Sequence, residues 1–307
     1  MKRILVTSDF HIDERFDLDQ VSRLLDTVIE EANKRDELWL LGDMSHDNQL
    51  SARVLYLLVS FLTKIRVPIR MIGGNHDEAD GTVTTLDWIP LVFPTIQFTK
   101  DSQHFDCEGL KILLGHFNVE ESVMGAYDFK LKSGVSLGDL GVDLACLGHI
   151  HKQQIIKGHN ITAFHPGSLF YQDIGERNDK KSLTELVLDN GKFELNLIPL
   201  DPDPMIQLEV TPEDDISEVL AKLPLTARVR IVVHYSDPLL IKKDVSKKYD
   251  NYNFRDKKVI FQFEDSKKTL EQRVKMSHQG MIQLDDFLKK QDPSIANLIK
   301  KYLKETK

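Results

Sequence analysis

The sequence predicts an α/β fold in which a parallel sheet with flanking helices faces a second, mostly antiparallel sheet. Three observations predict it. Apolar runs alternate with segments of helical periodicity over residues 3–72, each apolar run ends in polar residues, and short strands replace the helices after residue 95. With 307 residues, 41% of them hydrophobic, the chain can bury a large core without disulfides or a structural metal. Any metal site therefore has to be explained by function.

Strands and helices alternate in the first part of the chain. Short apolar runs predict buried parallel strands at residues 3–7, 38–41 and 69–72. Apolar residues at helical spacing predict helices over residues 17–35 and 50–65. Because parallel α/β sheets carry their sites at the carboxyl ends of the strands, we expect a functional site where the polar residues after these strands meet.

Strands dominate the second part, and a domain boundary follows them. Further strands are predicted at 103–107, 111–115, 142–147, 161–164, 182–188 and 192–199, which we assign to the second sheet. The segment Asp201-Pro202-Asp203-Pro204 is typical of a boundary. We predict a main domain at 1–203, a small α+β domain at 204–265 and a helical tail at 266–307. The small domain would hold strands at 206–210, 228–235 and 259–263 and a helix at 212–222, and the tail would hold helices at 267–277 and 281–304.

Charge and cysteine use narrow the class of protein. The net charge is −8, yet residues 241–307 hold 17 Lys and Arg against 10 Asp and Glu. This basic tail could face nucleic acid or an acidic partner, or it could be a solvated helical surface. Only two cysteines occur and no Cys-x-x-Cys pair, which excludes a cysteine zinc site. The amino-terminal apolar run is too short for a signal peptide, and no stretch is long enough to span a membrane, so we expect a cytoplasmic protein.

Five polar clusters follow the predicted strands. They are Asp9-x-His11, Gly42-Asp43, Gly74-Asn75-His76-Asp77, Gly115-His116 and Gly148-His149-x-His151. Each alone could be a turn or a surface loop, but six of the 11 histidines fall in or next to these clusters. Imidazole and carboxylate ligands suit Mn, Fe or Zn, and a shared carboxylate can hold two such ions close together. The clusters together predict a two-metal site.

The order of these clusters resembles the calcineurin-like metallophosphoesterase superfamily over residues 1–200. The resemblance implies a four-layer αββα sandwich, in agreement with the two predicted sheets. It implies a first metal site of Asp9, His11, Asp43 and His151, and a second of Asp43, Asn75, His116 and His149, with Asp43 bridging the two ions. It also implies that His76 faces the scissile phosphate and that Asp77 orients His76. A cationic imidazole there would offset charge that develops on the leaving group.

Within the superfamily, the residues resemble the SbcD-type nucleases of double-strand-break repair. Protein phosphatases carry an Arg shortly after Gly-Asp and a Glu after Gly-Asn-His, whereas this chain has Met44-Ser45-His46-Asp47 and Asp77. His46 matches a second active-site histidine found in some of these nucleases, although it could be a plain loop residue. The segment 164–169, followed by Glu176 and Lys180-Lys181, resembles the nuclease segment after the last metal motif. We assign no role to His165 within it.

The same resemblance implies partners. SbcD-type nucleases continue into a capping domain that contacts DNA, then into a helical tail that docks on the coiled-coil base of an SMC-like ATPase of the SbcC type. Residues 204–265 and 266–307 have this order, although the apolar faces of the tail could instead pack on the capping domain. The helix at 50–65 is apolar around its circumference, which predicts a homodimer through it or a helix buried on both sides.

We therefore predict a manganese-dependent DNA exo- and endonuclease, the nuclease subunit of an SbcC–SbcD-type complex for DNA repair and recombination. Mg²⁺, Fe²⁺ or Zn²⁺ could occupy the same ligands as Mn²⁺. Its setting would be a bacterial or bacteriophage-infected cell. Two alternatives stay open: a phosphodiesterase of small nucleotides, and a non-catalytic scaffold on the same fold.

Overall fold

A computed structural model describes residues 1–78, 83–125, 129–130, 134–237 and 239–263. The chain divides into two compact units. Of the described residues, the first comprises those within Met1–Gln207, Pro224–Arg228 and Phe254–Asp256, and the second comprises those within Leu208–Leu223, Val229–Asn253 and 257–263. The two tail helices predicted at 267–277 and 281–304 lie outside the described residues.

The first sheet has six strands in the order β13-β12-β1-β2-β3-β4. Their bounds are β1 Lys2–Thr7, β2 Glu37–Leu41, β3 Ile69–Ile72, β4 Gln97–Thr99, β12 Ser182–Asp189 and β13 Lys192–Pro199. The strands β1 to β4 are parallel, and β12 joins β1 antiparallel with Ile4 opposite Leu186. The assignment of 182–188 and 192–199 to the second sheet was therefore wrong. The strand β12 is buried on both faces, so it needs a place inside the first sheet, between β1 and β13.

The second sheet has five strands in the order β10-β11-β9-β6-β5. Their bounds are β5 Gln103–Cys107, β6 Leu110–His116, β9 Leu144–Gly148, β10 Gln154–Gly158 and β11 Ile161–His165. Contrary to the expected antiparallel arrangement, the three central strands β6, β9 and β11 run parallel, and only the edge strands are antiparallel. Long connections allow this, because the chain crosses over between β6 and β9 and again between β9 and β11.

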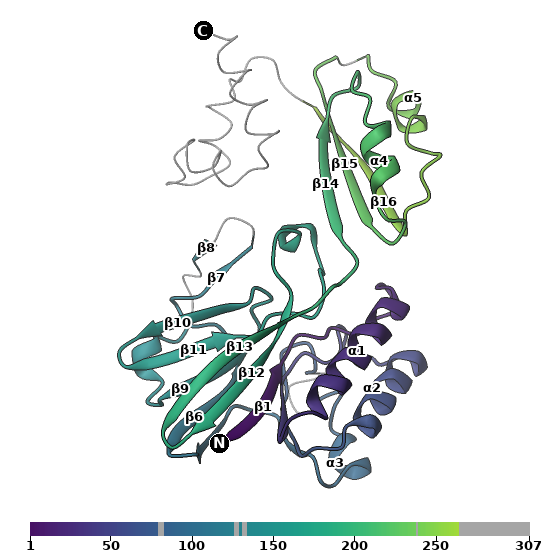
Figure 1. The fold of residues 1–307 in the computed structure, drawn as a ribbon. Coiled ribbons are helices and arrows are strands. Elements are labelled where there is room, and N and C mark those ends of the chain that lie inside the picture. Colours follow the sequence, from purple (N-terminus) through teal and green to yellow (C-terminus); the bar gives the residue numbers. More distant parts are fainter. Residues whose placement is uncertain (79–82, 126–128, 131–133, 238, 264–307) are drawn as a thin grey trace. The chain divides into compact units, whose positions relative to one another are not determined.

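Two helices cover the outer face of the first sheet (Figure 1). They are α1 Leu18–Ala32 and α2 Ala52–Lys64. Each begins at a polar cap, since Asp17 accepts a hydrogen bond from the backbone N–H of Asp19 and Ser51 accepts one from Val54. The apolar face of α1 packs with that of α2 in one core against the sheet. A short helix, α3 Ile89–Val92, precedes β4.

Three hydrophobic cores separate the layers. One lies between the helices and the first sheet, and a second lies between the two sheets, with Val6 and Trp39 facing Ile112 and Cys146. A third covers the outer face of the second sheet. In the described part of the chain, this outermost layer holds the 3₁₀ helix η1 Leu137–Asp139 and loops, with the small hairpin β7 Val123–Met124 and β8 Phe129–Lys130 nearby in sequence. The layered α/β sandwich that the sequence predicted is thus confirmed, with a loop-rich fourth layer.

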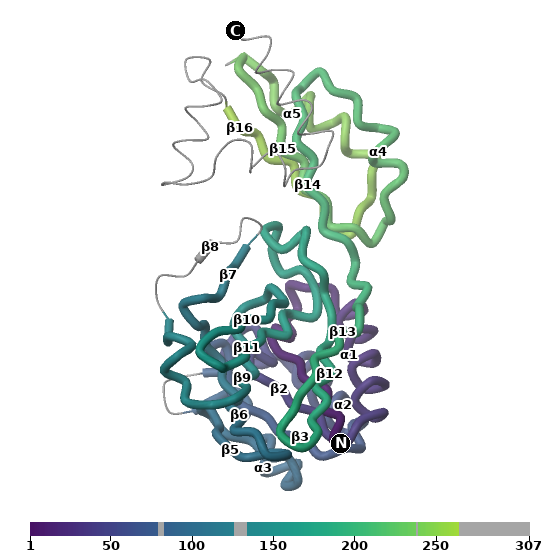
Figure 2. Tube along the Cα trace, turned by 60° about the vertical axis from the view of Figure 1, so that its left-hand side comes forward, coloured from purple at the N-terminus to yellow at the C-terminus, as the bar shows by residue number. Residues whose placement is uncertain are grey.

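The second unit is built on a three-stranded sheet in the order β14-β15-β16. Its elements are β14 Met205–Val210, α4 Ser217–Lys222, β15 Arg228–Tyr235, α5 Lys242–Lys247 and β16 Asp256–Phe263, and Figure 2 traces the chain from β13 into β14. The helix predicted at 212–222 begins only at Ser217. It is preceded by a turn in which the Asp214 carboxylate accepts hydrogen bonds from the Thr211 backbone N–H and hydroxyl. Among the described residues, no helix is both long and apolar enough to cross a membrane.

Candidate metal centre

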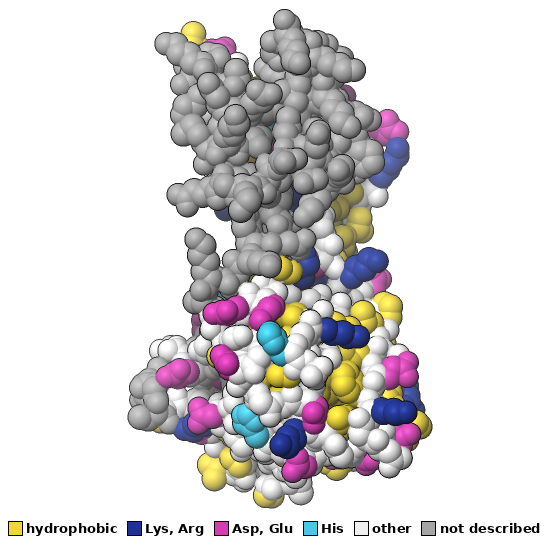
Figure 3. All heavy atoms as spheres, turned by 90° about the vertical axis from the view of Figure 1, so that its left-hand side faces the viewer, with side chains coloured by type: hydrophobic (Ala, Val, Ile, Leu, Met, Phe, Trp, Pro, Cys, Tyr) yellow, Lys and Arg dark blue, Asp and Glu magenta, His cyan; other side chains and the backbone are white. Residues whose placement is uncertain are grey.

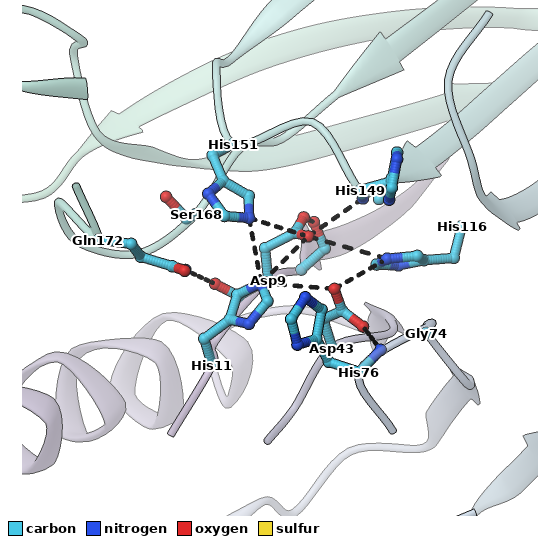
Figure 4. A network of polar contacts seen from close by, with 12 residues as sticks. Asp9, His11, Asp43, Gly74, His76, His116, His149, His151, Ser168 and Gln172 are labelled. Carbon is cyan, nitrogen blue, oxygen red and sulfur yellow. Dashed lines mark hydrogen bonds and ion pairs between the residues drawn. The ribbon is translucent and has the colours of Figure 1, made fainter. Parts of the chain in front are cut away.

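The carboxyl ends of strands from both sheets bring the predicted ligands together (Figure 4). Asp9 and Asp43 follow β1 and β2, and Asn75 follows β3. From the second sheet, His116 ends β6 and His149 follows β9. The carboxyl ends of the parallel strands of both sheets thus meet at one place, which is where parallel α/β sheets carry their functional sites.

Four of the predicted ligands have left-handed backbone conformations. The φ angles are 54° at Asp9, 44° at His11, 52° at Asp43 and 80° at His149. Such angles are uncommon for residues other than glycine, and they persist only where the surroundings enforce them. Here the backbone N–H of Asp9 donates to the Gly42 carbonyl (3.1 Å) and that of His11 donates to the Asp43 carbonyl (2.9 Å). The fold therefore holds the ligand loops in a conformation that the residues themselves disfavour.

Glycines in the motifs allow the loops to approach closely. A Cβ on Gly74 would lie 2.2 Å from Oδ1 of Asp43, and a Cβ on Gly148 would lie 2.2 Å from the carbonyl oxygen of Leu41. Real Cβ atoms do not make such contacts. Gly74 and Gly148 are thus required by packing around the candidate ligands.

Two compact clusters of donor atoms result, one of Asp9, His11 and His151 and one of Asp9, Asp43 and His116. In the first, the Nε2 atoms of His11 and His151 are 3.0 Å apart. Oδ2 of Asp43 lies between the clusters, 3.4 Å from Nε2 of His11 and 3.1 Å from Nε2 of His116. This is the place expected of a bridging carboxylate, and Oδ1 of Asp9 also faces both clusters at 3.8–4.0 Å.

The donor atoms suit divalent cations. Nδ1 of His116 pairs with the Leu41 carbonyl (2.6 Å), so a neutral ring turns an Nε2 lone pair toward the Asp43 carboxylate. Two acceptors face each other there unless a proton or a cation lies between them. Burial lowers the pKa of His116, but the hydrogen bond to Asp43 and the charge of Asp9 outweigh it and raise that pKa to about 9. A metal cation would take the place of this proton, so His116 and Asp43 together can bind a metal ion.

The ring of His11 is held neutral. Burial, together with the neighbouring imidazoles of His151, His76 and His46, lowers the pKa of His11 to about 2 despite the charge of Asp43. A neutral imidazole is the form that binds a metal. Burial raises the pKa of Asp43, but the hydrogen bond from His116 and the charge of that ring outweigh it and lower the pKa to about 2, so the carboxylate is charged.

Asn75 and His149 lie at the exposed rim of the site, outside the two compact clusters. Nδ1 of His149 is 2.9 Å from Oδ1 of Asn75, and the backbone N–H of His149 donates to Oδ1 of Asp9 (3.1 Å). The two predicted ligands are therefore brought next to each other and to the site, with their side chains paired together.

The two histidines expected to act on the phosphate lie against His11. The ring centroids of His76 and His46 are 4.7 Å and 5.1 Å from that of His11, and the three form a third cluster of ring nitrogens. The backbone N–H of His76 donates to Oδ1 of Asp43 (2.8 Å), and its Nδ1 pairs with the His46 carbonyl oxygen (2.7 Å). Both rings thus adjoin the candidate metal site.

Asp77 has a different place from the one expected. It is fully buried, and its carboxylate accepts hydrogen bonds from the backbone N–H groups of Met44 (3.1 Å), Ser45 (3.2 Å) and Gly74 (3.0 Å). The expectation that Asp77 orients His76 was wrong, because the His46 carbonyl occupies that role. Asp77 instead ties the loop of Asp43 to the loop of Asn75, and burial and the charge of Asp43 raise its pKa to about 6.

Several residues of the site were missed from the sequence. Oε1 of Glu176 is 2.7 Å from Nδ1 of His151, and Lys181 donates to the other carboxylate oxygen (2.6 Å). His165 is fully buried, with Nδ1 3.0 Å from the Gly148 carbonyl and Nε2 3.0 Å from the Ser122 hydroxyl. The spacing after the last metal motif carried a signal for Glu176 and Lys181, but only the folded loop between β11 and β12 shows what they contact.

Comparisons of the sequence and the structure with known proteins indicate which family the chain resembles. A sequence model of the calcineurin-like phosphoesterase superfamily domain matches residues 1–189. Solved structures similar to the chain include an archaeal phosphodiesterase, with 16% identity and a TM-score of 0.41 over 64% of this chain and 99% of that one. Zinc-bound Vps29 of Entamoeba histolytica has 16% identity and a TM-score of 0.38 over 65% of this chain and 99% of that one. A predicted phosphoesterase of Streptococcus pneumoniae has 16% identity and a TM-score of 0.36 over 66% of this chain and 92% of that one. No curated protein matches the chain in sequence.

Proposed function

The chain belongs to the calcineurin-like phosphoesterase superfamily, and from this premise we propose that it is a two-metal phosphodiesterase that cleaves DNA. The observation that carries the proposal is the joining of two carboxylate–imidazole clusters through Asp43, with the imidazoles of His76 and His46 beside them. Mn²⁺ is the expected ion, since oxygen and imidazole ligands suit it.

The residues of the site have separate roles in the proposed hydrolysis. Divalent cations, when bound to Asp9, His11, Asp43, Asn75, His116, His149 and His151, supply charge neutralisation and activation of water. Nδ1 of His76 donates to the His46 carbonyl, so His76 holds a proton on Nε2 only as the imidazolium. That form can protonate the leaving oxygen of a phosphodiester. Asp43 fixes the loop by accepting from the His76 backbone N–H.

DNA as the substrate is supported by two features. His46 lies beside His76, with ring centroids 5.0 Å apart, where the resemblance to SbcD-type nucleases places a second active-site histidine. A separate unit with its own three-stranded sheet follows the phosphoesterase domain, in the order that a capping domain would have. We extend the proposal to a subunit of an SbcC–SbcD-type complex whose ATPase partner binds residues 266–307, a segment outside the described residues.

Cleavage of linear duplex DNA tests the proposal. The full chain is stripped with EDTA, reloaded with Mn²⁺ and assayed on DNA and on a small chromogenic phosphodiester. We expect wild-type protein to degrade DNA, and His76→Ala to lower the rate by about 10²–10⁴-fold because the proton donor is lost. His46→Ala should lower it as well. His104→Ala is the matched control, since His104 is an exposed histidine on β5 outside the site.

The possible outcomes separate the candidate functions. Turnover of the small diester without any attack on DNA would replace the nuclease with a small-nucleotide phosphodiesterase. Absence of turnover on either substrate, with two equivalents of metal bound, would replace it with a non-catalytic scaffold. Co-purification with a long coiled-coil ATPase, lost on removal of residues 266–307, is the expected result for the partner.

A further inference from the structure

We propose that Glu176 is a positioning residue of the metal centre, which fixes the His151 ring so that Nε2 faces the cluster of Asp9 and His11. The inference rests on the proposed function only in taking His151 as a metal ligand. It concerns a residue outside the five polar clusters. It predicts a selective effect on one of the two metal ions.

The Glu176 carboxylate is held from both sides. Oε1 is 2.7 Å from Nδ1 of His151, and Oε2 accepts hydrogen bonds from Nζ of Lys181 (2.6 Å) and the backbone N–H of Gln172 (3.3 Å). Its side chain is only 7% exposed. A charged carboxylate in this place has no freedom to turn away from His151, because each oxygen already has a partner.

Lys181 completes the arrangement. Its side chain is 1% exposed, and the three N–H groups of its ammonium have three acceptors: Glu176, the Ser168 hydroxyl (2.8 Å) and the His151 carbonyl oxygen (3.3 Å). The lysine thus holds the backbone of His151 while the glutamate holds its ring. A buried ion pair with all its hydrogen bonds made is a rigid support.

The consequence for His151 is a defined tautomer of the neutral ring. A carboxylate only accepts hydrogen bonds, so it requires the proton on Nδ1. In the neutral ring, Nε2 is then left with a lone pair, and it lies 3.0 Å from Nε2 of His11 and 3.8 Å from Oδ1 of Asp9. Carboxylates that accept from the far nitrogen of a metal-binding histidine orient the ring and strengthen it as a ligand.

Manganese binding without substrate tests the inference. Titration calorimetry of Mn²⁺ into the metal-free full chain should show two sites. Glu176→Gln should weaken one by about 10–100-fold and leave the other unchanged, since an amide has one acceptor oxygen and cannot serve both His151 and Lys181. Ring ¹⁵N spectra of the metal-free protein give a second reading. The spectra are recorded at a pH high enough for the ring to be neutral, and the His151 signals are assigned by their loss in His151→Ala. They should show the Nδ1–H tautomer in wild type and a mixture of tautomers in Glu176→Gln.

Two further variants keep the test decisive. Glu185→Gln removes a similarly buried carboxylate, paired with Arg3 and Arg35, that contacts none of the ligands, so both Mn²⁺ affinities should stay at wild-type values. Should Glu176→Gln misfold, Glu176→Leu with Lys181→Met removes the charge pair together, and we expect a folded protein with one weakened site. Wild-type affinity at both sites in the folded variants, or a mixed tautomer in wild type, overturns the inference. Two-site Mn²⁺ binding without DNA cleavage would overturn the proposed function and leave this inference standing.

Discussion

At the scale of single residues, the site depends on glycines and backbone amides as well as on the candidate ligands. Gly74 and Gly148 leave room for the carboxylate of Asp43 and the carbonyl of Leu41. Backbone N–H groups donate hydrogen bonds to the carboxylate of Asp77. The chemistry-bearing residues are thus placed by close backbone packing. Substitutions at these supporting positions should be as harmful as the loss of a ligand.

Gly74→Ala should disrupt metal binding at one or both sites and destabilise the fold. Its Cβ would lie 2.2 Å from Oδ1 and 2.4 Å from the backbone nitrogen of Asp43, so the loop must move. We expect a loss of about 1–3 kcal/mol in the free energy of unfolding, as for overpacking in a well-packed core, with no measurable Mn²⁺ at one or both sites. Urea unfolding and calorimetry measure these. Gly158→Ala is the control, since its Cβ would meet only Leu137 at an ordinary 3.4 Å.

Asp77→Ala should reduce stability more than His76→Ala does. The buried backbone N–H groups of Met44 and Ser45 and the partly buried one of Gly74 lose their acceptor in the first variant, at about 1–3 kcal/mol for each buried group left unsatisfied. The half-buried ring of His76 has no comparable role. Thermal unfolding of the metal-free variants checks the order. An Asp77→Ala protein as stable as wild type would contradict the assignment of Asp77 as a tie between the two loops.

At the scale of elements, β12 secures the first sheet. Its Glu185 carboxylate accepts hydrogen bonds from Nε (3.0 Å) and Nη2 (2.7 Å) of Arg3 on β1, and Nε of Arg35, in the loop after α1, lies 3.1 Å away. These contacts join the segment that the sequence placed in the wrong sheet to the first strand of the chain. They also give the sheet a pH-dependent contribution to stability.

Glu185→Gln should cost stability at neutral pH and less in acid. Burial raises the pKa of Glu185, but the hydrogen bond from Arg3 and the charge of Arg35 outweigh it and hold that pKa below its ordinary value. The stabilisation is therefore present above the unfolded pKa, about 4.3, and is lost as pH falls through the folded value. We expect a difference of about 1–2 kcal/mol at pH 7, reduced because Arg3 is 44% exposed. Urea unfolding at pH 7 and below pH 4 measures it, and a difference that grows in acid would contradict the ion-pair account.

Helix α2 leaves apolar side chains uncovered. Val54, Leu58, Phe61 and Leu62 are buried, whereas Leu55 is 38% and Tyr56 71% exposed. We propose that this exposed side forms the interface of a homodimer. Light scattering at micromolar concentration should show a dimer that Tyr56→Lys converts to a folded monomer. Val219→Lys, at an exposed apolar residue of α4 in the other unit, should leave the dimer intact. A monomeric wild type would contradict the proposal.

At the scale of the whole molecule, charge sets the dependence on metal. The net charge is −8, and the face of the first unit in Figure 3 carries acidic and basic side chains side by side rather than one basic surface. At the site itself, Asp9 and Asp43 are buried carboxylates. Without cations, these carboxylates repel one another and any phosphate.

Mn²⁺ should therefore stabilise the folded chain. A ligand that binds only the folded state at 100 times its Kd adds about 2.7 kcal/mol, which raises the Tm of a domain of this size by about 5–10 °C. Calorimetric scans with EDTA and with Mn²⁺ measure the shift. Asp43→Asn should lose most of it, because the carboxylate between both clusters loses its charge. An equal Tm with and without metal would contradict a loaded two-metal site.

The sequence by itself determined the order of strands and helices in the first part, the phosphoesterase pattern and the residues that meet at the strand ends. These follow from local signals, because apolar periodicity sets each element and a motif such as Gly74-Asn75-His76-Asp77 lies in one short segment. Only the tertiary structure decided that β12 and β13 join the first sheet, that Asp77 ties two loops instead of orienting His76, and that Glu176 reaches His151. These depend on strand pairing and on hydrogen bonds between segments far apart in the chain. Such contacts cannot be predicted from the periodicity or spacing of residues within one segment.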